Sequence, residues 1–504
     1  MKRMVSVEAL SSVHIVGVAG SATSGLARIL GSRGITVTGS DRTRAGLLDD
    51  DASNGDASNG DASNPVAPNS DVSEESPEGA PPPIRVHAGH APTNVADDVE
   101  LVVHSAAIPA DNPELCAARE RGIPIKKYAE FLGDLMREQR GLAVAGTHGK
   151  TSTAGMVASI LMAAGRDPSV LIGGVHPHLR GNWRQGRGGD FLAEACEFDR
   201  SFLALFPEFA VVTNLELDHP DVYASESDLT EAFQAFVDRI PATGHLIVNG
   251  DDPGASTLHA SSGCRRVTFG FGAGCDYRAV EVNDGARPTF EIHCERYPAQ
   301  AIVLRVPGVH NVSNALAAVA LAAELGVEPR YWRAGLAAFP GIERRFQPRG
   351  TVAGVTLIDD YAHHPTEVAR ALEAARAVYP NHKIRAVFEP HQFTRLRAFA
   401  PAFAAALANA DAVDVLPVFS VREALPPDPR RPAEHLVEMV EAHGVSAVSY
   451  ESIATAAELR VNTPREGDEA WVVLGAGVAP SFTTAALAAL WGPTGAGEES
   501  EKSS

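Results

Sequence analysis

The 504-residue sequence is short of cysteine and has no long apolar run. Its five cysteines are odd in number and include no C-x-x-C pair, so a paired-cysteine zinc site is not expected. We predict reduced thiols in a reducing compartment. No window of about twenty apolar residues exists, so no membrane-spanning helix is predicted. The cysteines are Cys116, Cys196, Cys264, Cys275 and Cys294.

Basic residues are outnumbered by acidic ones. The chain has 43 Lys and Arg against 63 Asp and Glu, which gives a net charge of −20. A nucleic-acid partner would need a basic face to neutralise its phosphates, so none is expected. Lys2 and Arg3 open the chain, but Glu8 interrupts the stretch after them, which is not typical of a targeting signal. We expect a cytoplasmic monomer or weak dimer without membrane insertion.

The chain is too long for one hydrophobic core, and its length favours about three domains. Strand-like apolar runs alternate with helix-like stretches in three successive regions, which predicts three α/β domains over 1–140, 141–340 and 341–490, followed by a disordered tail over 491–504. The predicted strands are 13–18, 35–41 and 100–108 in the first domain, 190–196, 209–215 and 244–252 in the second, and 354–361, 384–390, 412–419 and 469–477 in the third.

Residues 49–83 form a low-complexity insert within the first domain. The segment repeats DASNG and continues into acidic and proline-rich sequence with almost no apolar residues. Such a composition cannot bury enough surface to order itself, so a disordered loop is predicted. A specific binding role for the repeat is the alternative.

The stretch GTHGKTST, residues 146–153, has the character of a phosphate-binding loop. Its glycines allow backbone N–H groups to converge on an anion, Lys150 supplies a positive charge, and the Thr151 hydroxyl can ligate Mg²⁺ at the start of a helix. Val144 stands where the usual motif has its first glycine, so a simple glycine turn with a solvated lysine is the alternative. The predicted ATP contacts here are Gly146, Thr147, His148, Gly149, Lys150, Thr151 and Ser152.

Two later strands end in residues that suit a hard metal ion. Glu194 ends one apolar run and His219 follows another, and ligands of open α/β sheets bind at the carboxyl ends of strands. Thr151, Glu194 and His219 would hold Mg²⁺, with water and phosphate completing its shell. The other histidines lie in no H-E-x-x-H motif, so zinc is not expected.

The first domain opens with GVAGSATSG, residues 17–25. Ala19 and Ala22 replace glycines of the dinucleotide fingerprint, which disfavours NAD. A strand, a glycine turn and Asp41 at the end of the next strand still predict a cradle for a nucleotide diphosphate.

Taken together, these motifs resemble the Mur ligases, the ATP-dependent amide-bond-forming enzymes of peptidoglycan synthesis. The resemblance covers nearly the whole chain except the insert and the tail. The motifs that carry it, in the order of the family, are GTHGKTST, EACEFDRSF, VVTNLELDHPD, HNVSNALAA, ERRFQ, DDYAHHPTEV and EPHQFTR.

The resemblance implies a Rossmann-like UDP-binding domain, a central P-loop ATPase-type domain and a Rossmann-like C-terminal domain. It assigns UDP-sugar binding to Gly17, Gly20, Ser40, Asp41, Ser105 and His148. It adds Asn311, Arg345 and Asp360 to the ATP contacts, and assigns catalysis to Lys150, Glu194, His219, Asn314 and Arg345. It assigns the amino-acid substrate to His363, His364 and Arg395, where a guanidinium suits a carboxylate.

The implied reaction uses ATP and Mg²⁺ to join L-alanine to the lactyl carboxylate of UDP-N-acetylmuramate through an acyl phosphate. The alternative within the family is a ligase that adds the tripeptide L-Ala-γ-D-Glu-meso-diaminopimelate in cell-wall recycling, and the first-domain stretch GVAGSATSG leans toward that enzyme.

Three other protein classes are the alternatives, and each predicts a different experimental result. A P-loop NTPase or kinase would release phosphate without an amine, a dehydrogenase would bind nicotinamide, and a UDP-sugar-binding regulator would show no turnover. The C-terminal motifs disfavour the first class, and Ala19 and Ala22 disfavour the second. The intact Lys150, Glu194 and His219 disfavour the third.

Overall fold

The computed structural model describes residues 7–42, 46–47, 84–179, 181–220, 222–420 and 423–491. The predicted insert over 49–83 lies outside the described residues, and so does the predicted tail beyond residue 491. The chain divides into two compact units. Unit 1 comprises Met1–Glu216, Ser227–Arg278 and Ala315–Gly335, and unit 2 comprises Leu217–Glu226, Ala279–Asn314 and Leu336–Ser504.

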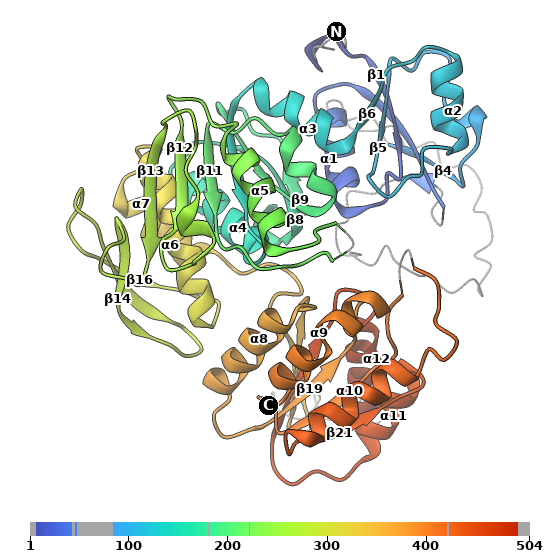
Figure 1. The fold of residues 1–504 in the computed structure, drawn as a ribbon, viewed down its shortest axis with the longest axis vertical. Coiled ribbons are helices and arrows are strands. Elements are labelled where there is room, and N and C mark those ends of the chain that lie inside the picture. The colour runs from blue at the N-terminus through green and yellow to red at the C-terminus, as the bar shows by residue number, and fades with distance from the viewer. Residues whose placement is uncertain are drawn as a thin grey trace, which may run out of the picture. The chain divides into compact units, whose positions relative to one another are not determined.

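Unit 1 opens with a sheet of strand order β3-β4-β2-β1-β5-β6. Figure 1 labels its strands β1, β4, β5 and β6. All its neighbours are parallel except the edge pair of β3 and β4. Strand β1 is buried along its whole length, as expected for the middle of a parallel sheet covered on both faces. The elements are β1 Ser12–Val16, α1 Ser21–Ser32, β2 Thr36–Asp41, β3 Gly46–Leu47, β4 Arg85–Ala88, β5 Leu101–His104, α2 Pro113–Glu120, β6 Ile125–Lys127 and α3 Tyr128–Arg137.

The part of the second sheet that belongs to unit 1 runs in the order β13-β12-β11-β7-β10-β8-β9, and β14 begins beside β13. Its central strands are buried and parallel, and α4 is buried around most of its surface because apolar residues occupy nearly every side of it. The elements are β7 Arg140–Ala145, α4 Lys150–Ala163, β8 Ser169–His176, β9 Gly181–Arg184, β10 Asp190–Glu194, β11 Phe209–Val212, α5 Glu226–Val237, β12 His245–Asn249, β13 Arg265–Gly270 and β14 Tyr277–Asn283.

Unit 2 is built on a sheet of order β17-β18-β22-β19-β20-β21, parallel except for β17. Alternate strand residues pack on opposite faces: Phe388 joins the core under α8, α9 and α10, and its neighbour Val387 joins the core under α11 and α12. The elements are β17 Gln347–Val352, β18 Val355–Asp360, α8 Pro365–Val378, β19 Lys383–Phe388, α9 Phe393–Leu407, β20 Ala412–Val415, α10 Arg431–Ala442, β21 Ser446–Ser449, α11 Ile453–Asn462, β22 Glu469–Leu474 and α12 Pro480–Trp491.

Four further elements follow β14 and precede β17 in the sequence. Strands β15 and β16 pair antiparallel as a hairpin, and helices α6 and α7 follow them. Their bounds are β15 Thr289–His293, β16 Gln300–Val303, α6 Val309–Glu324 and α7 Pro329–Ala338. The stretch NVSNALAAVALAAELG, residues 311–326, has a helical pattern and corresponds to α6, whereas no strand was predicted between 265 and 303.

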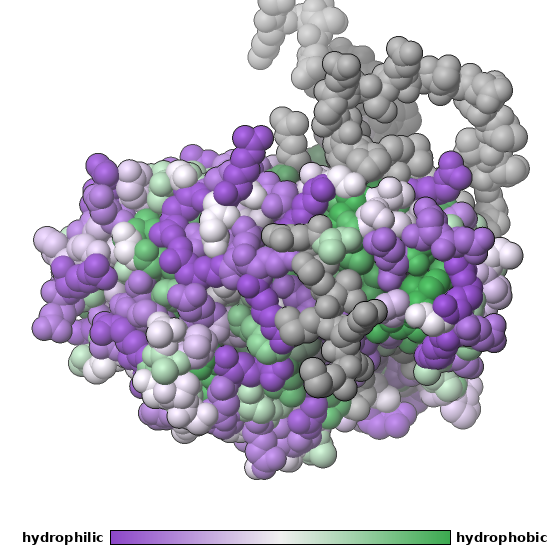
Figure 2. Space-filling view, turned by 90° about the horizontal axis from the view of Figure 1, so that it is seen from above, coloured by the Kyte–Doolittle hydropathy of each residue, from purple (hydrophilic) through white to green (hydrophobic). Residues whose placement is uncertain are grey.

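The predicted strands are present within a few residues of their predicted ends and alternate with helices, so the α/β fold class is confirmed. The face drawn in Figure 2 is mostly hydrophilic, with small apolar areas between polar ones. None of the helices in the described part of the chain is long and apolar enough to cross a membrane.

A buried carboxylate ties the elements of the first sheet together. Glu114, in the first turn of α2, accepts hydrogen bonds from Ser40 Oγ (2.5 Å), Asn94 Nδ2 (2.5 Å) and the backbone N–H of Ala91 (3.2 Å), and lies 3.5 Å from His14 Nε2. Burial would raise its pKa, but His14 and these donors lower the pKa of Glu114 to about 2. Its contribution to stability is therefore present above the ordinary Glu pKa and is lost as the pH falls toward 2.

We predict that Glu114→Ala lowers the free energy of unfolding by about 3 kcal/mol, because the buried donors of Ser40 and Asn94 lose their acceptor. Urea unfolding at neutral pH measures the change. Glu120→Ala, at the exposed end of the same helix, is the matched control and should change stability by less than about 0.5 kcal/mol. Equal effects of the two substitutions would contradict a special role for the Glu114 contacts.

Candidate active site

The predicted phosphate loop connects β7 to α4 and depends on two glycines. Gly146 has φ of +133° and Gly149 has φ of +80°, backbone conformations that residues with a Cβ rarely adopt. A Cβ on Gly146 would also lie 1.9 Å from Thr213 Oγ1. The two glycines therefore allow the backbone N–H groups of the loop to converge at the N-terminus of α4. Converging N–H groups at a helix N-terminus bind phosphate.

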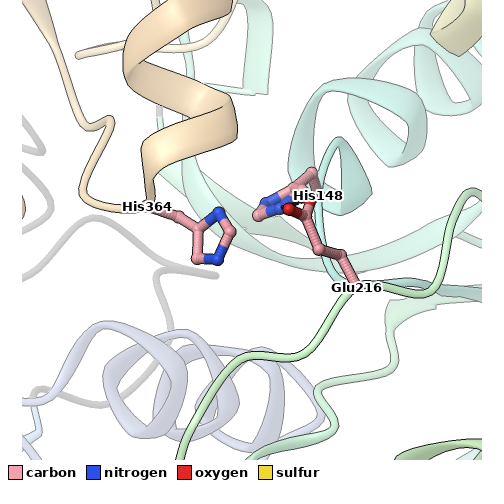
Figure 3. A group of neighbouring side chains, drawn as sticks. All are labelled: His148, Glu216 and His364. Atoms are coloured by element: carbon pink, nitrogen blue, oxygen red, sulfur yellow. Dashed lines mark hydrogen bonds and ion pairs between the residues drawn. The ribbon is translucent and has the colours of Figure 1, made fainter. Parts of the chain in front are cut away.

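The loop is held from the end of the neighbouring strand β11. Thr213 Oγ1 donates to the carbonyl of His148 (2.6 Å), and the backbone N–H of His148 donates to Asn214 Oδ1 (2.8 Å). The side chains of His148 and Glu216 face each other, with Nε2 and Oε2 3.1 Å apart (Figure 3). Sequence reasoning missed Thr213 and Asn214, although both follow an apolar strand at the edge where ligands bind.

Lys150 is held inside the loop. Its Nζ donates to the carbonyls of Gly146 (2.6 Å) and Thr147 (2.9 Å) and to Glu197 Oε1 (3.0 Å). Burial alone would lower the pKa of Lys150, but the Glu197 carboxylate, with Cys196 and Glu194 nearby, raises it above its usual range. The lysine is therefore a fixed positive charge at neutral pH. Glu197 was not predicted as a site residue.

Thr151 and Glu194 lie together, as predicted. Thr151 Oγ1 donates to Glu194 Oε2 (2.8 Å), and the backbone N–H of Gly173 donates to the same oxygen (2.8 Å). The Thr151 hydroxyl at the start of α4 and the Glu194 carboxylate at the end of β10 are hard oxygen ligands that fit Mg²⁺ beside bound phosphate. His219 belongs to unit 2, so its part in the metal site stays a prediction.

The predicted UDP-sugar residues of the first sheet gather at the carboxyl ends of three adjacent strands. The backbone N–H of Gly17 donates to the carbonyl of Ser40 (2.8 Å), and a Cβ on Gly17 would lie 3.5 Å from Ser105 Cβ. Gly20 precedes α1, where the Thr23 hydroxyl donates to the carbonyl of Gly17 (2.6 Å). Asp41 ends β2 directly after Ser40. The carboxyl edge of this sheet and the N-terminus of α1 together offer a place where a diphosphate can bind.

In unit 2, Arg345 and Asp360 lie close enough for their charges to interact. Asp360 accepts the backbone N–H groups of Phe346 (2.7 Å) and Ala362 (2.8 Å), and burial raises its pKa to about 6 although the Arg345 charge opposes the rise. Arg345 also lies over the Tyr361 ring at 5.0 Å. The arrangement presents a cation beside an aromatic ring.

Asn311 and Asn314 lie on one face of α6, as their spacing predicts. Asn314 Nδ2 donates to Asn311 Oδ1 (3.1 Å), and Asn311 Nδ2 donates to the carbonyl of Pro307 (2.7 Å). Asn311 Nδ2 also lies 3.2 Å from His310 Nε2, and burial lowers the pKa of His310 to about 4, so this imidazole is neutral at pH 7.

Arg395, in the first turn of α9, is almost fully buried, with 3% of its surface exposed. Its Nη2 lies 3.0 Å from Asp218 Oδ1 and 3.3 Å from His219 Nδ1, whereas Nε and Nη1 have no hydrogen-bond partner among the described residues. Buried N–H groups without a partner are rare, and a bound carboxylate would satisfy them. His219 itself has φ of +53°.

The two adjacent histidines differ in role. His364 caps α8, with its Nδ1 3.4 Å from the backbone N–H of Thr366 (Figure 3). His363 Nδ1 lies 3.0 Å from the carbonyl of Tyr361, and burial lowers the pKa of His363 to about 4. Both therefore lie at the carboxyl end of β18, where a substrate of this sheet would bind.

Comparison with known proteins supplies the family. Three family models match: the Mur ligase family catalytic domain over residues 83–140, the Mur ligase middle domain over 191–322 and the Mur ligase glutamate ligase domain over 344–477. The UDP-N-acetylmuramate–L-alanine ligase of Renibacterium salmoninarum is 44% identical over 424 residues, covering 83% of this chain and 84% of the relative. The chain belongs to the Mur ligase family.

Other members extend the comparison. The UDP-N-acetylmuramate–L-alanine ligase of Nitratidesulfovibrio vulgaris strain DP4 is 41% identical, covering 77% of this chain and 79% of the relative. The crystal structure of UDP-N-acetylmuramate–alanine ligase from Thermotoga maritima matches with a TM-score of 0.73 and 26% identity, covering 94% of this chain and 98% of that one. The predicted resemblance to the Mur ligases and the three-domain α/β architecture are thereby confirmed.

We predict that Gly146→Ala in this Mur ligase weakens binding of ATP with Mg²⁺ at least about tenfold, because a methyl group there collides with Thr213 and distorts the loop. Titration calorimetry measures the affinity. Gly189→Ala is the matched control, since a Cβ at that position meets nothing within 4 Å. Unchanged affinity in the Gly146 variant would show that the loop does not hold the nucleotide.

Proposed function

We propose that this chain joins L-alanine to the lactyl carboxylate of UDP-N-acetylmuramate at the expense of ATP. The observation that carries the proposal is the 38–44% identity, over at least 77% of the chain, to several proteins of that named activity. The site geometry supports it with a lysine-bearing phosphate loop in unit 1 and with a buried arginine in unit 2, Arg395, whose Nε and Nη1 have no hydrogen-bond partner among the described residues.

In the first step, the lactyl carboxylate attacks the γ-phosphorus of ATP, the bond to the bridging oxygen breaks, and an acyl phosphate and ADP result. Lys150 and the N–H groups of the loop at the start of α4 bind the phosphates, and they stabilise the charge on the transferring group. Thr151 and Glu194 would hold Mg²⁺, which neutralises phosphate charge when bound.

In the second step, the neutral amine of L-alanine attacks the acyl carbon and phosphate leaves, with one proton released as the amide forms. Arg395 orients the amino acid by binding its carboxylate through N–H groups that have no other partner among the described side chains. Gly17 and Ser105 bind the diphosphate of the UDP-sugar in the first sheet, and the Ser40 carbonyl positions Gly17 by accepting its N–H, while the buried Ser40 hydroxyl donates to Glu114. We also propose that the protein is cytoplasmic and that it is a monomer or weak dimer. Light scattering after gel filtration tests the oligomeric state.

The assay that tests the function measures phosphate release from ATP and Mg²⁺ with UDP-N-acetylmuramate. We predict release when L-alanine is added, together with a product heavier by one alanyl residue in mass spectrometry. A parallel reaction contains the tripeptide L-Ala-γ-D-Glu-meso-diaminopimelate instead. Release only with the tripeptide would assign the chain to recycling, and release without any amine would indicate an NTPase.

We predict that Arg395→Lys raises the KM for L-alanine at least about tenfold and leaves the KM for ATP within about twofold, because a lysine cannot reproduce the guanidinium donors. Arg397→Lys, an exposed arginine on the same helix, is the control and should leave both constants unchanged. A parallel rise of both KM values in the Arg395 variant would contradict the assignment.

A further inference from the structure

Glu389 is a fully buried carboxyl group that the proposed mechanism does not use. It follows β19 directly, at the carboxyl edge of the sheet in unit 2, and has 0% of its surface exposed. Oε1 accepts the backbone N–H of Gly477 (2.9 Å), whereas Oε2 has no hydrogen-bond partner within the described part of the chain. Burying such a group costs free energy, so its presence calls for an explanation.

The partner of Glu389 is a glycine-rich turn, residues 475–479, that connects β22 to α12. A Cβ on Gly477 would lie 2.5 Å from Glu389 Oε1, and a Cβ on Gly475 would lie 2.9 Å from Glu389 Cβ. From the other side, Arg344 Nη2 donates to the carbonyls of Gly475 (2.9 Å) and Gly477 (3.1 Å). The turn is therefore held between a carboxyl group and a guanidinium.

The turn supports residues of the predicted amino-acid site. The Phe419 ring lies against Gly477, where a Cβ would approach the ring to 2.4 Å. The ring of His391 lies 5.6 Å from that of Phe419 and 5.7 Å from that of His363, a predicted substrate contact. A continuous chain of contacts thus leads from Glu389 to His363.

We propose that Glu389 is a positioning residue, which holds the 475–479 turn so that Phe419, His391 and His363 are correctly placed for the amino-acid substrate. The proposal rests on the proposed function for the identity of that substrate. Any side chain with an acceptor at the Oε1 position satisfies the requirement, and a side chain without one does not.

The protonation of Glu389 provides an independent signature. Burial raises the pKa of Glu389 to about 7, and the N–H groups of Gly477 and its neighbours and the Arg344 charge oppose the rise only in part. Arg344, which binds the turn, is the charged group whose field acts on Glu389, and His391, two residues along the chain, is a titratable group that packs on Phe419. The stability that the neutral carboxyl provides is present below the ordinary Glu pKa and is lost as the pH rises through about 7.

The experiment compares Glu389→Gln, which keeps an acceptor for Gly477, with Glu389→Ala, which does not. We expect Glu389→Ala to raise the KM for L-alanine at least about tenfold and to leave the KM for ATP within about twofold. Glu389→Gln should stay within about twofold of the parent for both constants at pH 7. Glu441→Gln, an exposed substitution on α10, is the control and should change neither.

Two further measurements do not depend on turnover. Hydrogen exchange of the 475–479 backbone amides should be faster in Glu389→Ala and unchanged in Glu389→Gln. Glu389→Gln should melt at a higher temperature than the parent at about pH 8.5, and the difference should shrink toward about pH 5.

The outcomes are separable. If the parent chain releases no phosphate with L-alanine, the proposed function fails, and the exchange measurement still decides whether Glu389 holds the turn. Equal KM values for L-alanine in the Gln and Ala variants would overturn the positioning role. A uniform loss of kcat with unchanged KM would also overturn it, and so would unchanged exchange in Glu389→Ala.

Discussion

The contact between the phosphate loop and the end of β11 is the constraint on which the active site depends. Thr213 occupies the space that a side chain on residue 146 would need, and its hydroxyl holds the carbonyl of His148. A loop fixed in this way keeps its N–H groups directed at one position before any ligand arrives. Preorganised dipoles of this kind stabilise transferring phosphoryl groups without a reorganisation cost during the reaction.

Lys150, proposed to bind phosphate, and Arg395, proposed to bind the amino-acid carboxylate, differ in how far their charged groups are already paired. Lys150 is already paired with Glu197 and loop carbonyls, so its position does not depend on a ligand. Arg395 has only part of its guanidinium engaged, by Asp218, and its remaining donors are buried without a partner in the described structure. The first arrangement suits a site that must be ready for ATP, and the second leaves binding capacity for an incoming carboxylate.

Part of the candidate site could be located from sequence. Glu194 and Thr151 were expected at the same sheet edge, and Thr151 Oγ1 lies 2.8 Å from Glu194 Oε2. Asn311 and Asn314 share a helix face, as their spacing requires. Glu197, Thr213 and Glu389 were not found. Their importance comes from partners distant in the chain, and neither their spacing nor their residue type distinguishes them from ordinary polar residues beside a strand.

The sequence by itself determined the strand and helix pattern, the phosphate loop and the family, because these depend on local periodicity, on glycine conformations and on motifs in a known order. Only the tertiary structure decided which polar groups are buried and what they contact. Glu389 acquires a raised pKa and a hydrogen bond from the Gly477 N–H because strands β19 and β22 pair side by side, although about ninety residues separate Glu389 from Gly477 in the chain.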